Sequence, residues 1–118
     1  MSNAQLTAVT LAFLAAHIVA VIAALAWKPG GAMAIPSVNA AVAVILLAYN
    51  VPRLLAYPGD NARLGLAVFE TLVLLLAAAA FWRVRLTFAA ACAVFAVHST
   101  ASLAAVVFAL TFRITRLF

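Results

Sequence analysis

The sequence predicts an all-α integral membrane protein, an up-down bundle of four transmembrane helices joined by short loops. The first observation is composition, because 70% of the 118 residues are hydrophobic and only nine are charged, seven Lys or Arg and two Asp or Glu. A soluble domain has about 45–50% apolar and about 25% charged residues, whereas a disordered chain has few apolar ones. The second observation is segregation, because seven of the nine charges lie outside four long apolar stretches.

Each apolar stretch is long enough to cross a bilayer, whose hydrocarbon core of about 30 Å takes about 20 helical residues. The predicted spans are Leu6–Trp27, Pro36–Tyr57, Leu64–Trp82 and Leu86–Phe112. Three of the four spans end on Trp or Tyr, as expected for side chains at a membrane–water interface. We therefore expect residues 1–118 to form a single membrane domain.

The segments between the spans have the residues of turns. Lys28-Pro29-Gly30-Gly31 ends the first span, because proline cannot continue a helix and glycine frees the backbone. Pro36 suits the first turn of the second helix, where a missing N–H costs nothing. Asp60 or Asn61 is expected to cap the third helix. Connections this short make consecutive helices antiparallel neighbours.

We expect the first span to be kept as a membrane helix, although Ala32-Met33-Ala34 resembles a signal-peptide cleavage site. Residues 1–5 carry no Lys or Arg, and the apolar stretch is longer than the about 7–15 residues of a signal peptide.

The basic residues leave the orientation of the bundle open between two interpretations. The side of the termini would collect Arg53, Arg63, Arg113 and Arg116, and the opposite side Lys28, Arg83 and Arg85. The side richer in Lys and Arg faces the cytoplasm, so the small excess favours cytoplasmic termini in a bacterial-type inner (plasma) membrane. The alternative is dual topology, in which oppositely inserted copies pair as an antiparallel dimer.

Polar residues within the predicted spans fall on one face of each helix at 100° per residue. These faces are Thr7, Thr10 and His17 on the first helix, Asn39, Asn50, Arg53 and Tyr57 on the second, and Thr87, Ala91, His98, Ser102 and Ala105 on the fourth. Because polar groups are costly in hydrocarbon, each face is expected to point into the bundle.

Depth in the membrane groups some of these residues. At about 1.5 Å per residue, His17 and His98 lie within about 2 Å of the midplane, and Glu70 lies about 4.5 Å from it. Arg53, about 10 Å from the midplane, is long enough to reach back to Glu70 across the hairpin of the second and third helices. The sequence thus predicts an Arg53–Glu70 pair.

Each of these residues also has a structural interpretation. Arg53 can extend to the interface, and Glu70 can be a neutral, hydrogen-bonded acid. His17 and His98 can be neutral imidazoles bonded to Thr10, Ser102 or a backbone carbonyl, which hold helices together without a further role.

Small residues predict close helix packing or self-association. Alanines recur every four residues at Ala12, Ala16, Ala20 and Ala24, and again at Ala89 and Ala93. Such ridges let helix backbones approach closely in lipid. The expected partners are therefore lipid and a second copy of the chain or a larger membrane complex. Nucleic acid is not expected, because the basic residues are scattered singly.

The leading functional hypothesis is a small transporter or channel-type subunit that uses Glu70 as a protonatable or cation-binding group. An acid inside the membrane is a functional candidate by default. Arg53 would tune its charge, Asn50 and Tyr57 would line the path, and a kink at Pro52 would provide a flexible point.

Two other hypotheses stand beside it. The chain has no HExxH, CxxC or glycine-rich phosphate loop, so enzyme chemistry and a metal site are not expected, and a non-catalytic accessory or assembly subunit of a larger complex is the alternative. The third hypothesis is a b-type haem or quinone-linked electron-transfer subunit, with His17 and His98 as axial ligands oriented by Thr10 and Ser102. No other cofactor is expected.

In size and four-span layout, the chain resembles the small multidrug resistance transporters. Members of that family place their coupling carboxylate in the first span, where this chain has no acidic residue. The resemblance therefore concerns the layout and assigns no role to Glu70.

Overall fold

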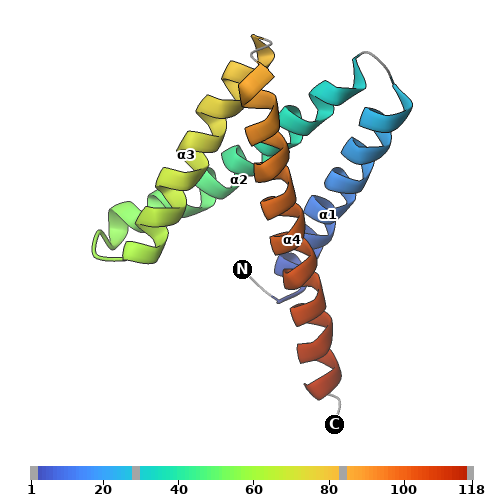
Figure 1. Ribbon diagram of the computed structural model, residues 1–118. Coiled ribbons are helices and arrows are strands. Elements are labelled where there is room, and N and C mark those ends of the chain that lie inside the picture. Colours follow the sequence, from blue (N-terminus) through green and yellow to red (C-terminus); the bar gives the residue numbers. More distant parts are fainter. Residues whose placement is uncertain (1–2, 28–29, 83–84, 117–118) are drawn as a thin grey trace.

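The computed structural model of the protein describes residues 3–27, 30–82 and 85–116. This part of the chain is all-helical, with four α-helices and one short 3₁₀ turn (Figure 1). The elements are α1 (Asn3–Ala26), η1 (Gly31–Met33), α2 (Ala34–Ala56), α3 (Asn61–Phe81) and α4 (Arg85–Arg116). Each α-helix contains a segment long and apolar enough to cross a membrane, which confirms the predicted number and kind of helices.

All four α-helices begin before the first residue of their predicted span. α2 begins two residues before Pro36, which the first turn tolerates because the first four N–H groups of a helix have no helical partner. α4 has 32 residues and continues past Phe112, so it is about 48 Å long against a hydrocarbon core of about 30 Å. Pro52, the expected kink, lies inside α2, and the helix continues to Ala56.

The helices are splayed rather than gathered into a compact cylinder. α2 and α3 form the most extensive pair, and α1 packs mainly against α4 (Figure 1). The C-terminal part of α4 projects away from the other helices, and the molecule measures 49 × 35 × 17 Å. The shape is therefore flat, with α4 in contact with each of the other three helices.

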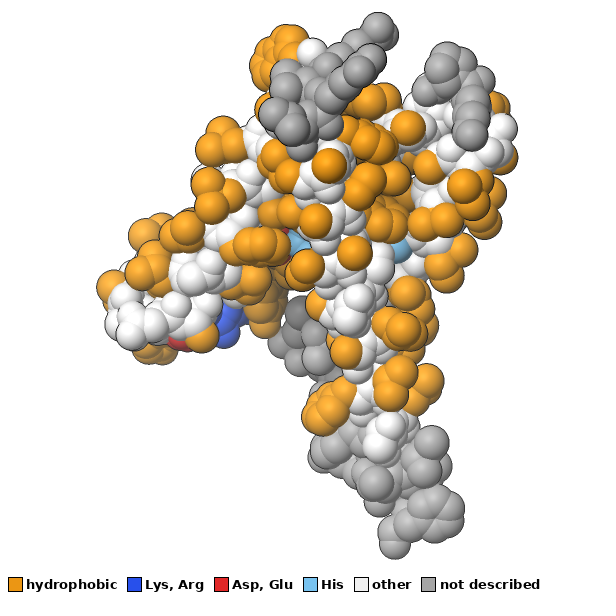
Figure 2. Space-filling view, in the orientation of Figure 1, with side chains coloured by type: hydrophobic (Ala, Val, Ile, Leu, Met, Phe, Trp, Pro, Cys, Tyr) orange, Lys and Arg blue, Asp and Glu red, His pale blue; other side chains and the backbone are white. Residues whose placement is uncertain are grey.

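The buried apolar residues are small. They are Ala20, Val42, Ala43, Ala67, Val73, Ala77, Ala80, Ala91, Phe95 and Val106, of which six are alanine. Large apolar side chains cover the surface instead (Figure 2). Helices in lipid gain nothing by hiding Leu or Ile from a medium that is equally apolar, so they associate through small residues that permit close approach. The core is thus of the kind expected inside a membrane.

Most of the predicted polar faces point inward. Thr7, His17, Asn39, Asn50, Ala91, His98 and Ser102 are all buried. Thr10, Thr87 and Ala105 are half-buried, whereas Arg53 and Tyr57 are exposed. They lie at the end of α2, where a long side chain with a polar tip can reach outward, so the prediction that they point into the bundle is wrong.

Five of the basic residues used to predict orientation cannot be placed. Lys28 and Arg83 lie outside the described residues, as do the side chains of Arg85, Arg113 and Arg116. Arg53 and Arg63 are described, and both lie near the α2–α3 turn.

Asp60 caps α3, and it is one of the two residues that were predicted for this role. Its backbone is extended, with φ −79° and ψ 92°, and its Oδ1 accepts a hydrogen bond of 3.1 Å from the backbone N–H of Arg63. Its Oδ2 also lies 3.1 Å from Arg63 Nε. One carboxylate therefore satisfies an otherwise unpaired N–H of the first turn and forms a part-exposed ion pair.

Replacing this cap should measurably weaken α3. We expect Asp60→Ala to lower the free energy of unfolding in detergent by about 1 kcal/mol, because a helix N–H loses its acceptor. Asp60→Asn keeps an acceptor at the same place and loses only the part-exposed ion pair, whose contribution is about 0–1 kcal/mol. Equal losses in the two variants would show that the ion pair, and not the cap, stabilises the turn.

Candidate functional site: a buried carboxyl–imidazole pair

Glu70 and His98 form a buried polar pair between α3 and α4. Glu70 Oε1 lies 3.0 Å from His98 Nε2. Only 1% of Glu70 and 5% of His98 is exposed. In Figure 2 the colour of histidine is visible only as small patches among apolar atoms. An acid and a base are therefore in hydrogen-bond contact in the middle of two helices long enough to cross a membrane.

The spacing of small residues brings the two side chains together. Glu70 belongs to a face of α3 that recurs every three or four residues, with Ala67, Val73, Ala77 and Ala80 as its other buried members. His98 belongs to the equivalent face of α4, with Ala91, Phe95, Ser102 and Val106. The small residues on both faces permit the close helix approach that a direct side-chain bond needs.

His17 of α1 lies beside this pair. Its Nδ1 is 2.5 Å from the carbonyl oxygen of Phe13, one turn earlier in the same helix. The His17 ring is tilted against Phe95, with centroids 4.8 Å apart, and lies edge-on to His98, with centroids 6.4 Å apart. The two histidines predicted to share a depth in the membrane are thus neighbours.

Four buried polar atoms in the described part of the chain have no hydrogen-bond partner. They are Glu70 Oε2, His98 Nδ1, His17 Nε2 and Asn39 Oδ1. Burying an unsatisfied polar atom costs about 1–3 kcal/mol, so each such atom needs an explanation. Three of the four belong to Glu70, His98 and His17, which makes this group the candidate functional site.

The predicted pairing of Arg53 with Glu70 is wrong. Arg53 Nη1 donates instead to the backbone oxygen of Tyr49 over 2.8 Å, and its guanidinium carbon lies 3.7 Å from the centre of the Tyr49 ring. This contact is made one turn back on the same helix, where a cation over an aromatic face is attracted by the ring electrons. The structural interpretation of Arg53, a side chain that reaches outward, is the one the structure shows.

Asn50 and Tyr57 contribute to the α2–α3 turn. Asn50 Oδ1 accepts a 2.9 Å hydrogen bond from Arg63 Nη1, and its Nδ2 donates to the backbone oxygen of Leu46 over 2.8 Å. Tyr57 ends α2 and is 74% exposed. Arg63, which sequence reasoning counted only as a surface charge, joins Asn50 to Asp60 and so fastens this turn.

The side chains expected to orient the histidines do not do so. Thr10 donates to the backbone oxygen of Thr7, and the His17 nitrogen that is bonded uses the Phe13 carbonyl. Ser102 is buried, but the bonded nitrogen of His98 uses Glu70. The hydrogen-bond partner of His17 is therefore a backbone carbonyl and that of His98 is the Glu70 carboxyl group, in place of the two hydroxyls that were predicted. The backbone carbonyl was among the alternatives for the histidines.

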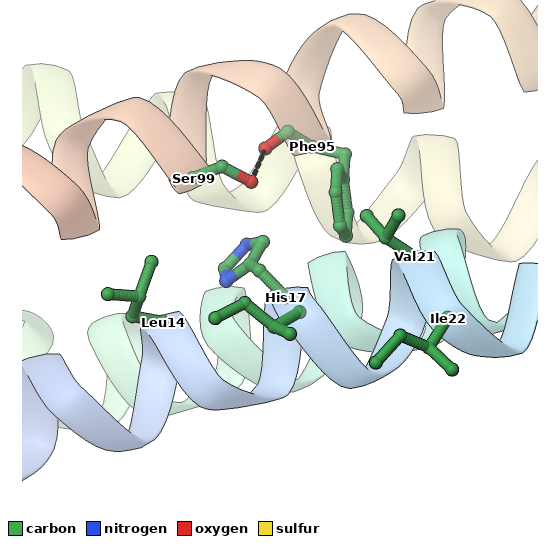
Figure 3. Close-up of a pocket in the computed structure, with 7 residues that line it drawn as sticks. Leu14, His17, Val21, Ile22, Phe95 and Ser99 are labelled. Atoms are coloured by element: carbon green, nitrogen blue, oxygen red, sulfur yellow. Dashed lines mark hydrogen bonds between the residues drawn. The ribbon is translucent and has the colours of Figure 1, made fainter.

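A pocket of about 290 Å³ opens between α1 and α4 beside His17 (Figure 3). It is lined by Leu14, His17, Ile18, Val21, Ile22, Phe95 and Ser99. In Figure 3 the His17 ring points from α1 toward α4, and the Ser99 hydroxyl donates to the backbone oxygen of Phe95 over 2.8 Å. Apart from His17 and Ser99, the walls of the pocket are thus apolar.

The nitrogen atoms bear on the haem hypothesis. Within the described residues no three His, Cys, Asp or Glu side chains are grouped to hold a metal ion, so haem would rely on His17 and His98 alone. His98 Nε2 is engaged with Glu70, which leaves Nδ1, the nitrogen nearest its own backbone. An axial bond from His98 would therefore use Nδ1, unless the contact with Glu70 were given up.

Comparisons of the chain with protein-family models, with curated proteins and with solved structures give no match.

Proposed function

We propose that the chain is a small transport or channel-type membrane subunit in which Glu70 and His98 bind and release a proton. The observation that carries this proposal is the 3.0 Å contact between a carboxyl and an imidazole, both buried within apolar helices. Chains of Asp, Glu and His inside membranes mark proton pathways in pumps and transporters. The proposal includes insertion of all four helices as an up-down bundle, which their length and apolar surfaces support.

The pair has two arrangements that differ only in the position of one proton. Either a His98 imidazolium donates its Nε2–H to a Glu70 carboxylate, or a Glu70 carboxyl O–H donates to a neutral His98. The first is an ion pair and the second is uncharged. Apolar surroundings disfavour the ion pair because they penalise buried charge, whereas the short distance between the two groups stabilises it. A further proton would convert the ion pair into a neutral acid beside an imidazolium and weaken the attraction between α3 and α4. Proton binding is thereby linked to helix packing.

Proton flux through the purified protein tests this proposal. A potassium diffusion potential, negative inside, would be applied to proteoliposomes that contain a pH-sensitive dye. We expect Glu70→Gln, which keeps the size and a hydrogen-bonding group, to reduce the rate of internal acidification about a hundredfold, as expected when a positioned proton-transfer group is removed. His98→Gln should act in the same direction.

The chain offers a matched control, because Asp60 is its one other acidic residue. Asp60→Asn makes the same change from acid to amide outside the buried pair and should leave the flux unchanged. A flux that Glu70→Gln does not alter would sink the proposal.

One specific observation supports the accessory-subunit hypothesis. A groove of about 440 Å³ runs along the exposed face of α4 beside Ala96, Val97, Thr100, Ala101 and Ala104. A helix of another subunit packs against small residues of this kind. No flux from the wild-type chain, together with recovery of a stoichiometric larger partner in mild detergent, would favour this hypothesis. A clean homodimer that conducts protons would favour the transport proposal.

A further inference from the structure

We propose that His17 is a third proton-carrying group, joined to His98 by one bound water, so that Glu70, His98 and His17 form a relay across α3, α4 and α1. The inference rests on the proposed proton-binding role of the Glu70–His98 pair. It extends that role to a helix that contributes no acidic residue and makes no direct bond to the pair.

The first step fixes where His17 carries its hydrogen. Its Nδ1 is bonded to the carbonyl oxygen of Phe13, and a carbonyl oxygen only accepts hydrogen bonds. Nδ1 must therefore hold a hydrogen, so in the neutral ring Nε2 is a bare acceptor. That atom is buried and has no partner.

The second step concerns the separation of the two imidazoles. With ring centroids 6.4 Å apart, no nitrogen of His17 comes closer than about 4 Å to a nitrogen of His98, which is too far for a direct hydrogen bond. A water that makes two bonds of about 2.8 Å can join atoms up to about 5.6 Å apart, a range that begins below this lower limit and extends beyond it. The atoms left for it are His17 Nε2 and His98 Nδ1, both buried and both without a protein partner.

The third step is the transfer itself. It begins with His98 as an imidazolium whose Nε2–H donates to the Glu70 carboxylate and whose Nδ1–H donates to the water oxygen. The Nδ1–H bond of His98 breaks as the water takes that proton, and one water O–H bond breaks as a new N–H bond forms at His17 Nε2. His98 is left neutral with its Nε2–H still on Glu70, and His17 becomes an imidazolium whose Nδ1–H remains on the Phe13 carbonyl. The number of protons and the water are unchanged.

The charges around the relay are few, which makes the transfer sensitive to each of its members. The titratable groups that face the relay are His17 from α1, Glu70 from α3 and His98 from α4. From α2 the buried polar groups are two neutral amides, Asn39, which donates to the backbone oxygen of Ala91 over 2.9 Å, and Asn50, which is bonded to Arg63 and to the backbone oxygen of Leu46. The described arginines are engaged elsewhere, Arg53 with Tyr49, and Arg63 with Asp60 and Asn50.

Nitrogen NMR in lipid bilayers can test the relay directly, because the chain has only two histidines. With ¹⁵N-labelled histidine, we expect His17 to show its hydrogen on Nδ1. We also expect a water proton to correlate with both His17 Nε2 and His98 Nδ1. His98→Gln removes the imidazole nitrogen on the other side of the water and should abolish the correlation at His17 Nε2.

Two variants keep the test interpretable. Asn39→Ala removes a buried polar group that lies outside the relay and should preserve the correlation of the water proton with both nitrogens. His17→Gln should reduce proton flux about tenfold or more, since it removes a proton-transfer group. A His17 Nε2 that shows no water correlation, or one that His98→Gln leaves unchanged, would overturn the relay. If flux still required Glu70 in that case, the proposed function would stand without His17.

Discussion

Replacement of His98 by Leu should lower the free energy of unfolding by about 3–5 kcal/mol, because it removes the one hydrogen-bond partner of a buried carboxyl. Glu70 is 1% exposed, and its second oxygen already has no partner. The acid would then lie in an apolar interface with neither oxygen satisfied, and it would have to lose its charge or open the contact between α3 and α4. Unfolding of the protein in bicelles would measure the loss.

A double variant distinguishes the interaction between Glu70 and His98 from the separate contributions of the two side chains. Glu70→Leu/His98→Leu removes both polar groups, and replacement of a whole buried pair by apolar residues of similar volume is often neutral or stabilising. We therefore expect the double variant to be more stable than His98→Leu alone, with a coupling energy of at least about 1 kcal/mol between the sites. Losses that simply add would contradict a direct interaction. The double variant should nevertheless conduct no protons, because stability and proton binding rest on different properties of the same two residues.

Gly31→Ala should disrupt the connection between α1 and α2. A Cβ at Gly31 would lie 1.9 Å from the backbone oxygen of Ala23 and 2.8 Å from its carbonyl carbon. The Gly31 N–H also donates to the backbone oxygen of Trp27 over 2.6 Å, which holds the turn against the end of α1. Because the obstacle is helical backbone and not a flexible side chain, the helices must move apart. We expect a loss of about 1–3 kcal/mol or more.

The neighbouring glycine is the matched control for this change. A Cβ at Gly30 would meet no atom within 4 Å, so Gly30→Ala should change the stability by no more than about 0.5 kcal/mol. Thermal unfolding of both variants in one detergent would compare them. Similar losses at the two positions would show that the close approach of Gly31 to α1 does not hold the turn. If only Gly31→Ala lowers the stability, this substitution should also displace α1 and so disturb the contact of His17 with Phe95.

Local physics explains why the helices could be predicted from the sequence. The length of an apolar stretch needed to cross a bilayer is set by the helix rise, and four such stretches became four helices. The cap of α3 depends on a side chain and a backbone N–H three residues apart, so it could be limited to Asp60 or Asn61 without knowledge of the other helices. The helix period likewise placed His17 and His98 on inward faces.

The partner of Glu70 was decided only by the tertiary structure. Adjacency in a hairpin suggested Arg53, but adjacency does not fix how each helix is rotated about its own axis. The packing of small residues sets that rotation, and it turns Glu70 toward α4 and leaves Arg53 exposed over Tyr49 on its own helix. The contact between Glu70 and His98 joins residues 28 positions apart, and the neighbourhood of His17 and His98 joins the first helix to the last. Helix periodicity shows that a residue faces inward, whereas only the assembled interfaces show which residue it meets.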